Sequence, residues 1–156
     1  SKTAALFAAA TQAGAIVAGA DARSEEAMRS FGRNLGVAFQ LVDDALDYSG
    51  REQSLGKSVG DDFREGKMTL PVVYAFDRAG EPDRDFWRRT IAEGRQRPGD
   101  FERACELIAA TRALEDTFAC ARRYAARALD DLALAPQNAF CAQLGAIAAQ
   151  SVVRIS

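Results

Sequence analysis

The sequence has no histidine among its 156 residues. This absence excludes serine-protease-like triads and metal sites that depend on imidazole ligands. Cysteine is also scarce, with three residues far apart at Cys105, Cys120 and Cys141. Their spacing fits neither a metal knuckle nor a disulfide framework, so we expect free thiols in a reducing compartment.

A basic surface and a long apolar run are missing as well. The formal net charge is -2 and the pI is near 5.3, which does not indicate general binding of nucleic acid. No apolar run reaches the roughly 18 residues of a membrane span, so no transmembrane segment is predicted. The remaining composition, 48% hydrophobic and 27% charged, is ordinary for a globular protein. The length permits one domain with a sizeable core.

Helical periodicity runs through most of the chain, and no period-2 strand pattern appears. The predicted fold class is therefore all-α, an array of about six or seven helices. We expect helices over residues 2–20, 24–48, 69–79, 85–94, 100–133 (one or two) and 138–155. Ser24 and Thr69 are the expected N-caps of the second and third helices, with Pro71 in the first turn of the third.

A few features are expected to be structural. Arg88-Arg89 and Arg122-Arg123 are predicted to be solvated helix faces, and Phe86 and Trp87 to pack in the core. The first helix is rich in alanine and contains Gly14, so we expect it to allow close helix packing.

Three aspartates interrupt an otherwise apolar helix in FQLVDDALDYSG, residues 39–50. At about 100° per residue, Gln40 shares one helix face with Asp43, Asp44 and Asp47. Without a cation, carboxylates at this spacing repel one another and destabilise the helix. Oxygen ligands without histidine or thiolate favour Mg²⁺, which keeps several waters and is often shared with substrate phosphates. An exposed acidic turn facing solvent is the alternative for such a motif.

The polar stretch that follows carries charges that suit a bound anion. Residues 50–68 contain four glycines and little periodicity, which predicts a long loop with room for one short helical turn. Lys57 follows Gly56, and Lys67 follows Gly66. A lysine beside a glycine on a loop suits the binding of a polyphosphate that the loop then covers. The segment is not a P-loop, because no glycine stands five residues before Gly56 and no strand precedes it.

Together, GVAFQLVDDALDY and GKSVGDDFREGKMTLPVVYA resemble the second half of a trans-prenyl (polyprenyl) diphosphate synthase, most closely the long-chain octaprenyl and decaprenyl branch. F-Q-x-x-D-D-x-x-D is similar to the family's second aspartate-rich motif, and G-K-x-x-G-x-D-x-x-E-G-K-x-T-x-P to the loop after it. Lys2-Thr3 resembles the K-T start of a family helix. The resemblance implies an all-α helical array of the isoprenoid synthase type. Residues 1–156 would form the C-terminal part of a single domain of that type.

The resemblance also implies an activity, a cofactor and residue roles. A family enzyme is a prenyltransferase that elongates an allylic diphosphate with isopentenyl diphosphate in a Mg²⁺-dependent reaction, releasing pyrophosphate. The implied metal ligands are Asp43, foremost, with Asp44 and Asp47. The implied catalytic residues are Lys2, Thr3, Gln40 and Lys57, and the implied substrate-binding residues are Lys2, Lys57 and Lys67. Lys67 is also expected to pair with Asp62 and thereby order the loop.

Other expectations concern the parts of the family pattern that these residues do not match. The family's first aspartate-rich motif has no counterpart here, so we expect the chain alone to be inactive. We also expect it to oligomerise or repack through exposed apolar faces. The full-length enzyme is expected to be a cytoplasmic homodimer that associates with the membrane receiving its product.

Alternatives remain open at this stage. One is a non-catalytic subunit that binds a partner synthase; another is a terpene cyclase, which the G-K loop disfavours. Product length is not encoded in these motifs, and the effect of Asp61, where the family commonly has a neutral residue, is also open.

Overall fold

The computed structural model describes residues 2–49, 59–136 and 138–153, with side chains up to residue 150. In these ranges there are eight α-helices, one π-helical segment and no strand, which confirms the all-α prediction. The helix count exceeds the six or seven predicted because the polar stretch contains α3 (Asp61–Arg64). None of the helices in these ranges has both the length and the apolar composition of a membrane span.

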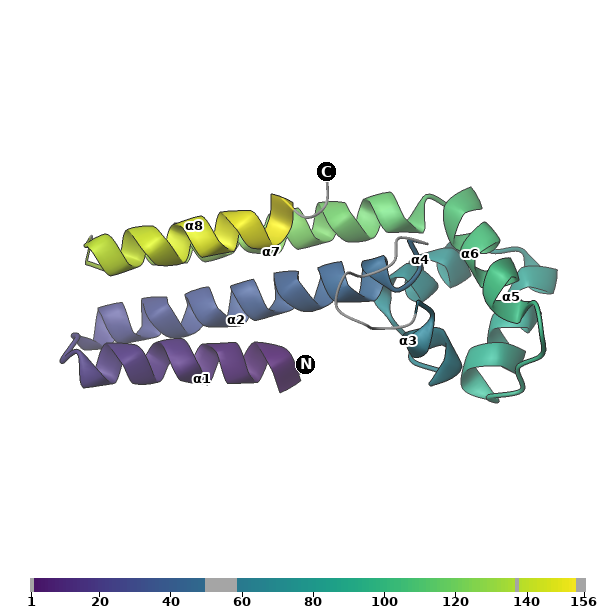
Figure 1. Cartoon of the computed structure of the whole chain (residues 1–156), viewed down its shortest axis with the longest axis horizontal. Helices are drawn as coiled ribbons and strands as arrows, with labels where there is room; N and C mark the ends of the chain where they lie inside the picture. The colour runs from purple at the N-terminus through teal and green to yellow at the C-terminus, as the bar shows by residue number, and fades with distance from the viewer. Residues whose placement is uncertain (1, 50–58, 137, 154–156) are drawn as a thin grey trace. The chain divides into compact units, whose positions relative to one another are not determined.

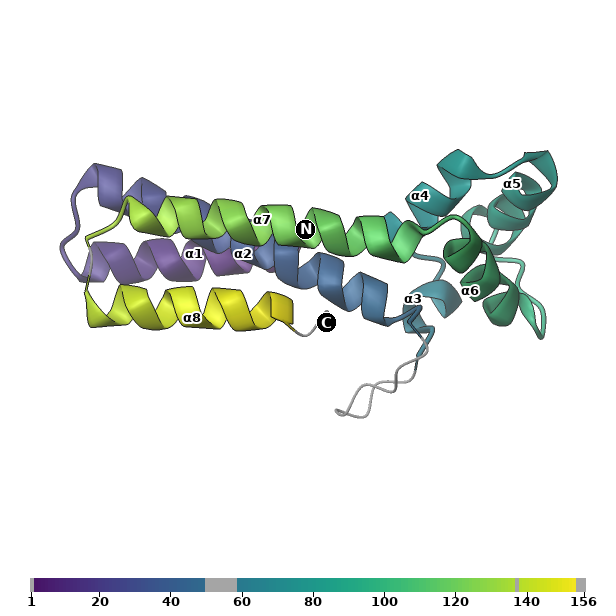
Figure 2. The same ribbon diagram turned by 90° about the horizontal axis from the view of Figure 1, so that it is seen from above.

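The chain divides into two compact units, residues 1–42 with 119–156 and residues 43–118. In the first unit, α1 (Lys2–Val17), α2 (Ala22–Leu46), α7 (Ala113–Ala133) and α8 (Ala139–Val153) lie side by side in both ribbon views (Figures 1 and 2). The end of α2 and the start of α7 belong to the second unit. The single-domain assignment stays a prediction.

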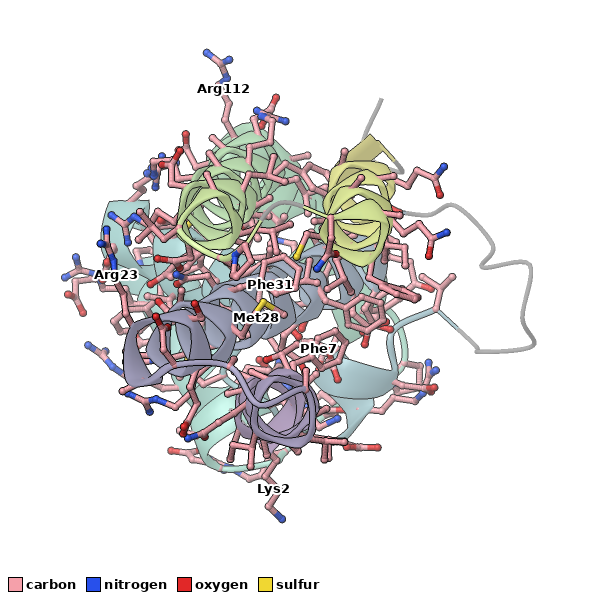
Figure 3. All side chains as sticks on the ribbon, turned by 90° about the vertical axis from the view of Figure 1, so that its left-hand side faces the viewer. Lys2, Phe7, Arg23, Met28, Phe31 and Arg112 are labelled. Carbon is pink, nitrogen blue, oxygen red and sulfur yellow. The ribbon has the colours of Figure 1, made fainter. Side chains whose placement is uncertain are left out.

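The core of the first unit combines a few large side chains with many alanines. Figure 3 shows Phe7, Met28 and Phe31 directed into the space among the helices, and Phe31 is fully buried. The buried cluster consists of Phe31, Leu35, Ala128, Leu132, Ala135, Cys141 and Ala148. Polar side chains add a tie between helices, since Ser30 and Asn34 of α2 donate to the Asp131 carboxylate of α7 at 2.8 and 2.6 Å.

Helices α1 and α2 approach closely at two glycines of α2. A Cβ atom at Gly36 would lie 2.7 Å from the Ala4 Cα, and one at Gly32 would lie 2.5 Å from the Phe7 carbonyl oxygen. Gly14 of α1 has no such neighbour within 4 Å. The close packing expected of α1 therefore depends on glycines that it meets in α2, and not on its own Gly14.

The predicted N-cap of α2 was wrong. The helix begins at Ala22, and the Asp21 Oδ1 accepts a hydrogen bond from the Ser24 backbone N–H at 2.8 Å. This hydrogen bond lowers the pKa of Asp21. Asp21 is the cap because its carboxylate reaches the third residue of the helix, and Ser24 already lies inside that helix.

The second unit is built from short helices around an aromatic core. It contains α3, α4 (Leu70–Arg78), α5 (Glu81–Trp87), the π-helical segment η1 (Arg88–Ala92) and α6 (Asp100–Ala110). Its core residues are Tyr48, Phe63, Val72, Ala75, Trp87, Ile91, Ala104, Leu107, Ile108 and Ala113. The prediction for Trp87 is confirmed, since it is 1% exposed, and partly buried Phe86 packs against the same core.

Two helix starts in this unit differ in detail from the predictions. The α5 helix begins at Glu81 and not near Asp85, because Pro82 suits a first helical turn and does not interrupt the helix. Thr69 occupies the N-cap position of α4 with Pro71 in the first turn, as predicted, but its side chain makes no capping hydrogen bond. Thr69 is instead buried.

Arg89 is not the solvated residue that we predicted. Its guanidinium donates to both oxygens of Asp100 at 2.8 Å, and the Asp100 Oδ2 also accepts from the Arg97 backbone N–H at 2.7 Å. The Arg89 hydrogen bonds are the main cause that lowers the pKa of Asp100. Arg88 is exposed, as predicted, and pairs with Asp85 at 2.7 Å. The two neighbours differ because only Arg89 faces the start of α6.

Candidate functional site

The acidic end of α2 is not an exposed turn. Asp44 is buried, with 9% of its surface exposed, and Asp43 is partly buried. Asp47 follows the helix end and is also partly buried, and its backbone N–H still donates to the Asp43 carbonyl at 3.2 Å. The alternative of three solvent-facing carboxylates therefore does not describe this segment.

Asp47 binds the backbone at the start of α3. Its Oδ1 accepts hydrogen bonds from the N–H groups of Gly60 at 3.0 Å and Asp61 at 3.2 Å. Its Oδ2 accepts from the Asp62 N–H at 2.9 Å, and its backbone carbonyl accepts from the Gly60 N–H at 3.1 Å. Burial raises the pKa of Asp47, and these N–H groups act in the opposite direction. The family resemblance implied a metal-binding role for Asp47, and this contact with the α3 backbone was not predicted.

The predicted pair between Lys67 and Asp62 is confirmed. The Lys67 Nζ lies 2.8 Å from the Asp62 Oδ1 and 2.7 Å from the Glu65 Oε2. These two carboxylates, Asp62 first, raise the pKa of Lys67. Asp61, whose effect was open, pairs with Arg64 of the same short helix at 2.6 Å. Its negative charge is therefore offset locally.

In the first unit, the structure brings Thr3 and Gln40 together. The Thr3 hydroxyl donates to the Gln40 Oε1 at 2.9 Å, across the contact between α1 and α2. Lys2 is exposed, and Figure 3 shows it pointing away from the packed helices. Lys57 lies outside the described residues.

One further tie was missed by sequence reasoning. The Gln96 side-chain amide donates to the carbonyl of Phe63, at the end of α3, at 2.6 Å and to that of Thr90 at 3.1 Å. It thereby fastens α3 to the segment after α5. No local sequence pattern identifies Gln96, because both of its acceptors are backbone carbonyls. Phe63 lies far from Gln96 along the chain, and Thr90 belongs to no recognisable motif.

The donor set fits a hard cation in its chemistry, although it does not form a complete cage. Asp43, Asp44 and Asp47 supply only carboxylate oxygens, which suit Mg²⁺. Within the described residues, no three side chains of aspartate, glutamate, cysteine or histidine converge as a ready-made metal site. Ligands from a substrate and from water would have to complete the coordination.

Comparisons with known proteins agree with these motifs. The family model described as polyprenyl synthetase matches residues 1–108. The octaprenyl diphosphate synthase of Haemophilus influenzae is 40% identical over 154 residues, which cover 99% of this chain and 46% of that protein. The chain thus spans about half the length of the curated relatives it matches.

Solved structures share the fold as well as the sequence. A decaprenyl diphosphate synthase from Rhodobacter capsulatus superposes with a TM-score of 0.91 at 42% identity, covering 99% of this chain and 48% of that one. A polyprenyl synthase from Caulobacter crescentus, complexed with calcium and isoprenyl diphosphate, gives a TM-score of 0.90 at 49% identity, covering 99% and 47%. The chain therefore belongs to the polyprenyl synthetase family and corresponds to its C-terminal half.

Proposed function

We propose that the intact protein carrying this chain is a prenyltransferase. It elongates an allylic diphosphate with isopentenyl diphosphate, forms a polyprenyl diphosphate and releases pyrophosphate. The observation that carries the proposal is one connected network in the second unit. Asp47 accepts from the Asp62 backbone, and Asp62 in turn holds Lys67. Acidic groups suited to a cation and a lysine suited to a phosphate are thereby fixed to the same short segment.

The proposed cofactor is Mg²⁺, with Asp43 as the principal ligand, Asp47 supporting the ion through its waters, and Asp44 as a secondary ligand. When bound, the ion supplies positive charge that stabilises the departing pyrophosphate. Support for a divalent ion comes from the carboxylate-only donor set and from the calcium in the related Caulobacter structure. Because the described residues form no complete cage, the ion would be shared with the diphosphate.

The remaining residues act on the substrate. Lys2, Lys57 and Lys67 contact diphosphate oxygens, where an ammonium group offsets negative charge. Thr3 and Gln40 present their oxygens to the allylic carbon that becomes positively charged when the diphosphate departs. Their mutual hydrogen bond supports this role, because it fixes the orientation of both polar groups before a substrate binds.

We propose that residues 1–156 are inactive alone, since the chain spans about half the length of its relatives. Exposed Leu6, Ile16 and Val17 on α1 and Phe140 and Ile147 on α8 support apolar contacts with further protein. The intact enzyme is proposed to be a homodimer in the cytoplasm, associated with the membrane that receives its product.

The test is prenyl transfer by the intact protein with an allylic diphosphate, isopentenyl diphosphate and Mg²⁺. Asp43→Asn should lower kcat by about 10²-fold or more, because a charged ligand is lost from the site. Asp77→Asn, which removes an exposed carboxylate of α4, should retain the wild-type rate. Equal rates for wild type and Asp43→Asn would contradict the proposal.

The same assay separates the alternatives. A non-catalytic subunit would show no turnover alone and would raise the rate of a partner synthase. A terpene cyclase would give cyclic products in place of linear polyprenyl diphosphates. Linear products made by the intact protein alone exclude both.

A further inference from the structure

We propose that Asp47 is a positioning residue that organises the start of α3 and thereby sets the place of Lys67. This is a different role from direct coordination of the metal. The proposal deepens the proposed function, because it concerns the same segment, and only its consequence for catalysis rests on that function. The effect of Asp47 on the start of α3 can be measured without any substrate.

Three successive backbone N–H groups converge on the Asp47 carboxylate. Gly60 and Asp61 donate to one oxygen at 3.0 and 3.2 Å, and Asp62 donates to the other at 2.9 Å. These donors are the unsatisfied N–H groups that every helix start leaves. A carboxylate that accepts from consecutive N–H groups makes charge-assisted hydrogen bonds, which are stronger than neutral ones. Asp47 therefore acts as an N-terminal cap supplied from 13 residues earlier in the chain.

The backbone at Gly60 is shaped for this anion. Gly60 has φ of 88°, in the left-handed region, and the next residues are helical. A left-handed residue next to a right-handed one turns successive N–H groups toward a common point, a concavity that binds anions. A side chain at Gly60 would also meet the Phe101 ring, with a Cβ only 2.8 Å from it. Both observations require glycine here, and Asp47 is the anion that fills the concavity.

The link to Lys67 passes through Asp62. The Asp62 N–H is held by Asp47, its carbonyl accepts from the Lys67 N–H at 2.9 Å, and its Oδ1 pairs with the Lys67 Nζ at 2.8 Å. A shift of the Asp62 backbone therefore moves both of these contacts, and the Glu65 carboxylate pairs with the same ammonium at 2.7 Å. In this way, the Asp47 carboxylate acts through Asp62 on the position of the lysine ammonium.

These contacts also restrict Asp47 as a metal ligand. A carboxylate has about four lone-pair positions, and three of those of Asp47 accept backbone hydrogen bonds. Direct coordination would compete with these bonds and release the start of α3. The backbone N–H groups of residues 60–62 donate to the Asp47 carboxylate, and Asp43 lies one helical turn earlier, so the two residues can be separated by experiment.

The first measurement is amide hydrogen exchange of the intact protein, without substrate or metal. In Asp47→Asn one acceptor oxygen is replaced by an NH₂ that cannot accept from the backbone, and the remaining amide oxygen is uncharged, so exchange at residues 60–62 should accelerate about tenfold or more. Asp43→Asn, the matched variant, should leave exchange at these residues unchanged. Exchange at residues 60–62 within twofold of wild type in Asp47→Asn would overturn the proposal, whether or not the protein transfers prenyl groups.

Asp47→Glu is a second variant, needed in case the protein does not fold with an uncharged side chain at position 47. It keeps the charge but moves the carboxylate by one methylene, so the proposal predicts faster exchange at residues 60–62 here too. A metal-ligand role predicts unchanged exchange in this variant, and that result would count against the proposal. Circular dichroism melting of each variant establishes that the comparison is made between folded proteins.

The second measurement uses turnover to separate positioning from coordination. Asp43→Asn should raise the Mg²⁺ concentration at half-maximal rate about tenfold or more, and Asp47→Asn should change it by less than about threefold. The double variant Asp47→Asn/Lys67→Met should have the same KM for the allylic diphosphate as Lys67→Met alone, because the effect of Asp47 is transmitted through Lys67. Additive effects on KM, or equal Mg²⁺ shifts in the two aspartate variants, would refute the positioning role.

Discussion

The two units reach stability by different means. Residues 1–42 and 119–156 contain eight basic and five acidic residues, and residues 43–118 contain twelve basic and seventeen acidic ones. Among the described residues, the first unit has one ion pair, Arg29 with Glu26, and the other ion pairs lie in the second unit. The first unit relies on long helices that pack through small residues. In the second unit short helices pack around an aromatic core, and charged side chains add contacts between them.

The length of the helices explains the difference. A helix leaves four N–H and four C=O groups without partners, and this cost weighs more on α3, α4 and α5 than on α1 or α2. Side chains of the second unit satisfy several of these groups, as Asp47 and Gln96 do. Acidic residues also lie in the first turns of α3, α5 and α6, where negative charge is favourable beside the helix N-terminus.

The largest effect is expected for the core of the second unit. Trp87→Ala should lower the free energy of unfolding by about 3–5 kcal/mol, since it removes the largest fully buried side chain and leaves a cavity. Urea titration followed by circular dichroism measures the change. Trp87→Phe, which retains much of the apolar area, should cost less. If both variants unfold like wild type, the aromatic core is not what holds the short helices together.

The contact between α1 and α2 should be the next most sensitive. Gly32→Ala should destabilise the chain by about 1–3 kcal/mol, because the new methyl meets the Phe7 backbone of α1. Gly14→Ala in α1 is the matched control. Its new methyl has nothing within 4 Å, so it should stabilise the chain by about 0.5–1 kcal/mol through helix propensity. If both substitutions changed the free energy of unfolding in the same direction, the close approach of α1 and α2 would not be what stabilises the first unit.

A smaller effect, dependent on pH, should appear in the second unit. Arg89 lowers the pKa of Asp100, so the charged form is favoured in the folded state. This contribution is fully present above the unfolded value of about 3.8 and is lost as the pH falls through the lower folded pKa. Asp100→Asn should therefore flatten the acid limb of stability against pH. Asp85→Asn, on an exposed pair, should leave that limb unchanged, and identical limbs in wild type and Asp100→Asn would argue against this role for Arg89.

The smallest effect is expected for the ion pair of the first unit. Arg29→Ala should leave the unfolding free energy unchanged within the error of a urea titration, because both partners are exposed. Addition of 0.5 M NaCl should likewise make no difference between this variant and wild type. A clear loss of stability would mean that ion pairs matter in the first unit as well, and the contrast between the units would weaken.

Part of the candidate site was readable in the sequence, because its signals are local. The D-D-x-x-D motif placed Asp43, Asp44 and Asp47 at the end of α2, and Lys67 and Asp62 form the pair expected from the family resemblance. The cap formed by Asp47 was not predicted, because a motif identifies a carboxylate without revealing which atoms approach it. Ser24 was assigned as a cap for a related reason, since several capping residues stood close together and only geometry selected Asp21.

The sequence by itself determined the all-α class, the burial of Trp87 and the position of the acidic motif. Helical period, apolar patterning and residue chemistry act over a few turns of chain, and all three are visible in the order of residues. Only the tertiary structure decided that Asp47 accepts a hydrogen bond from Gly60 and that Arg89 pairs with Asp100. It also decided that α1 packs closely against Gly32. Such contacts depend on the path of the backbone between distant residues, where distances of a few tenths of an ångström select one partner among several.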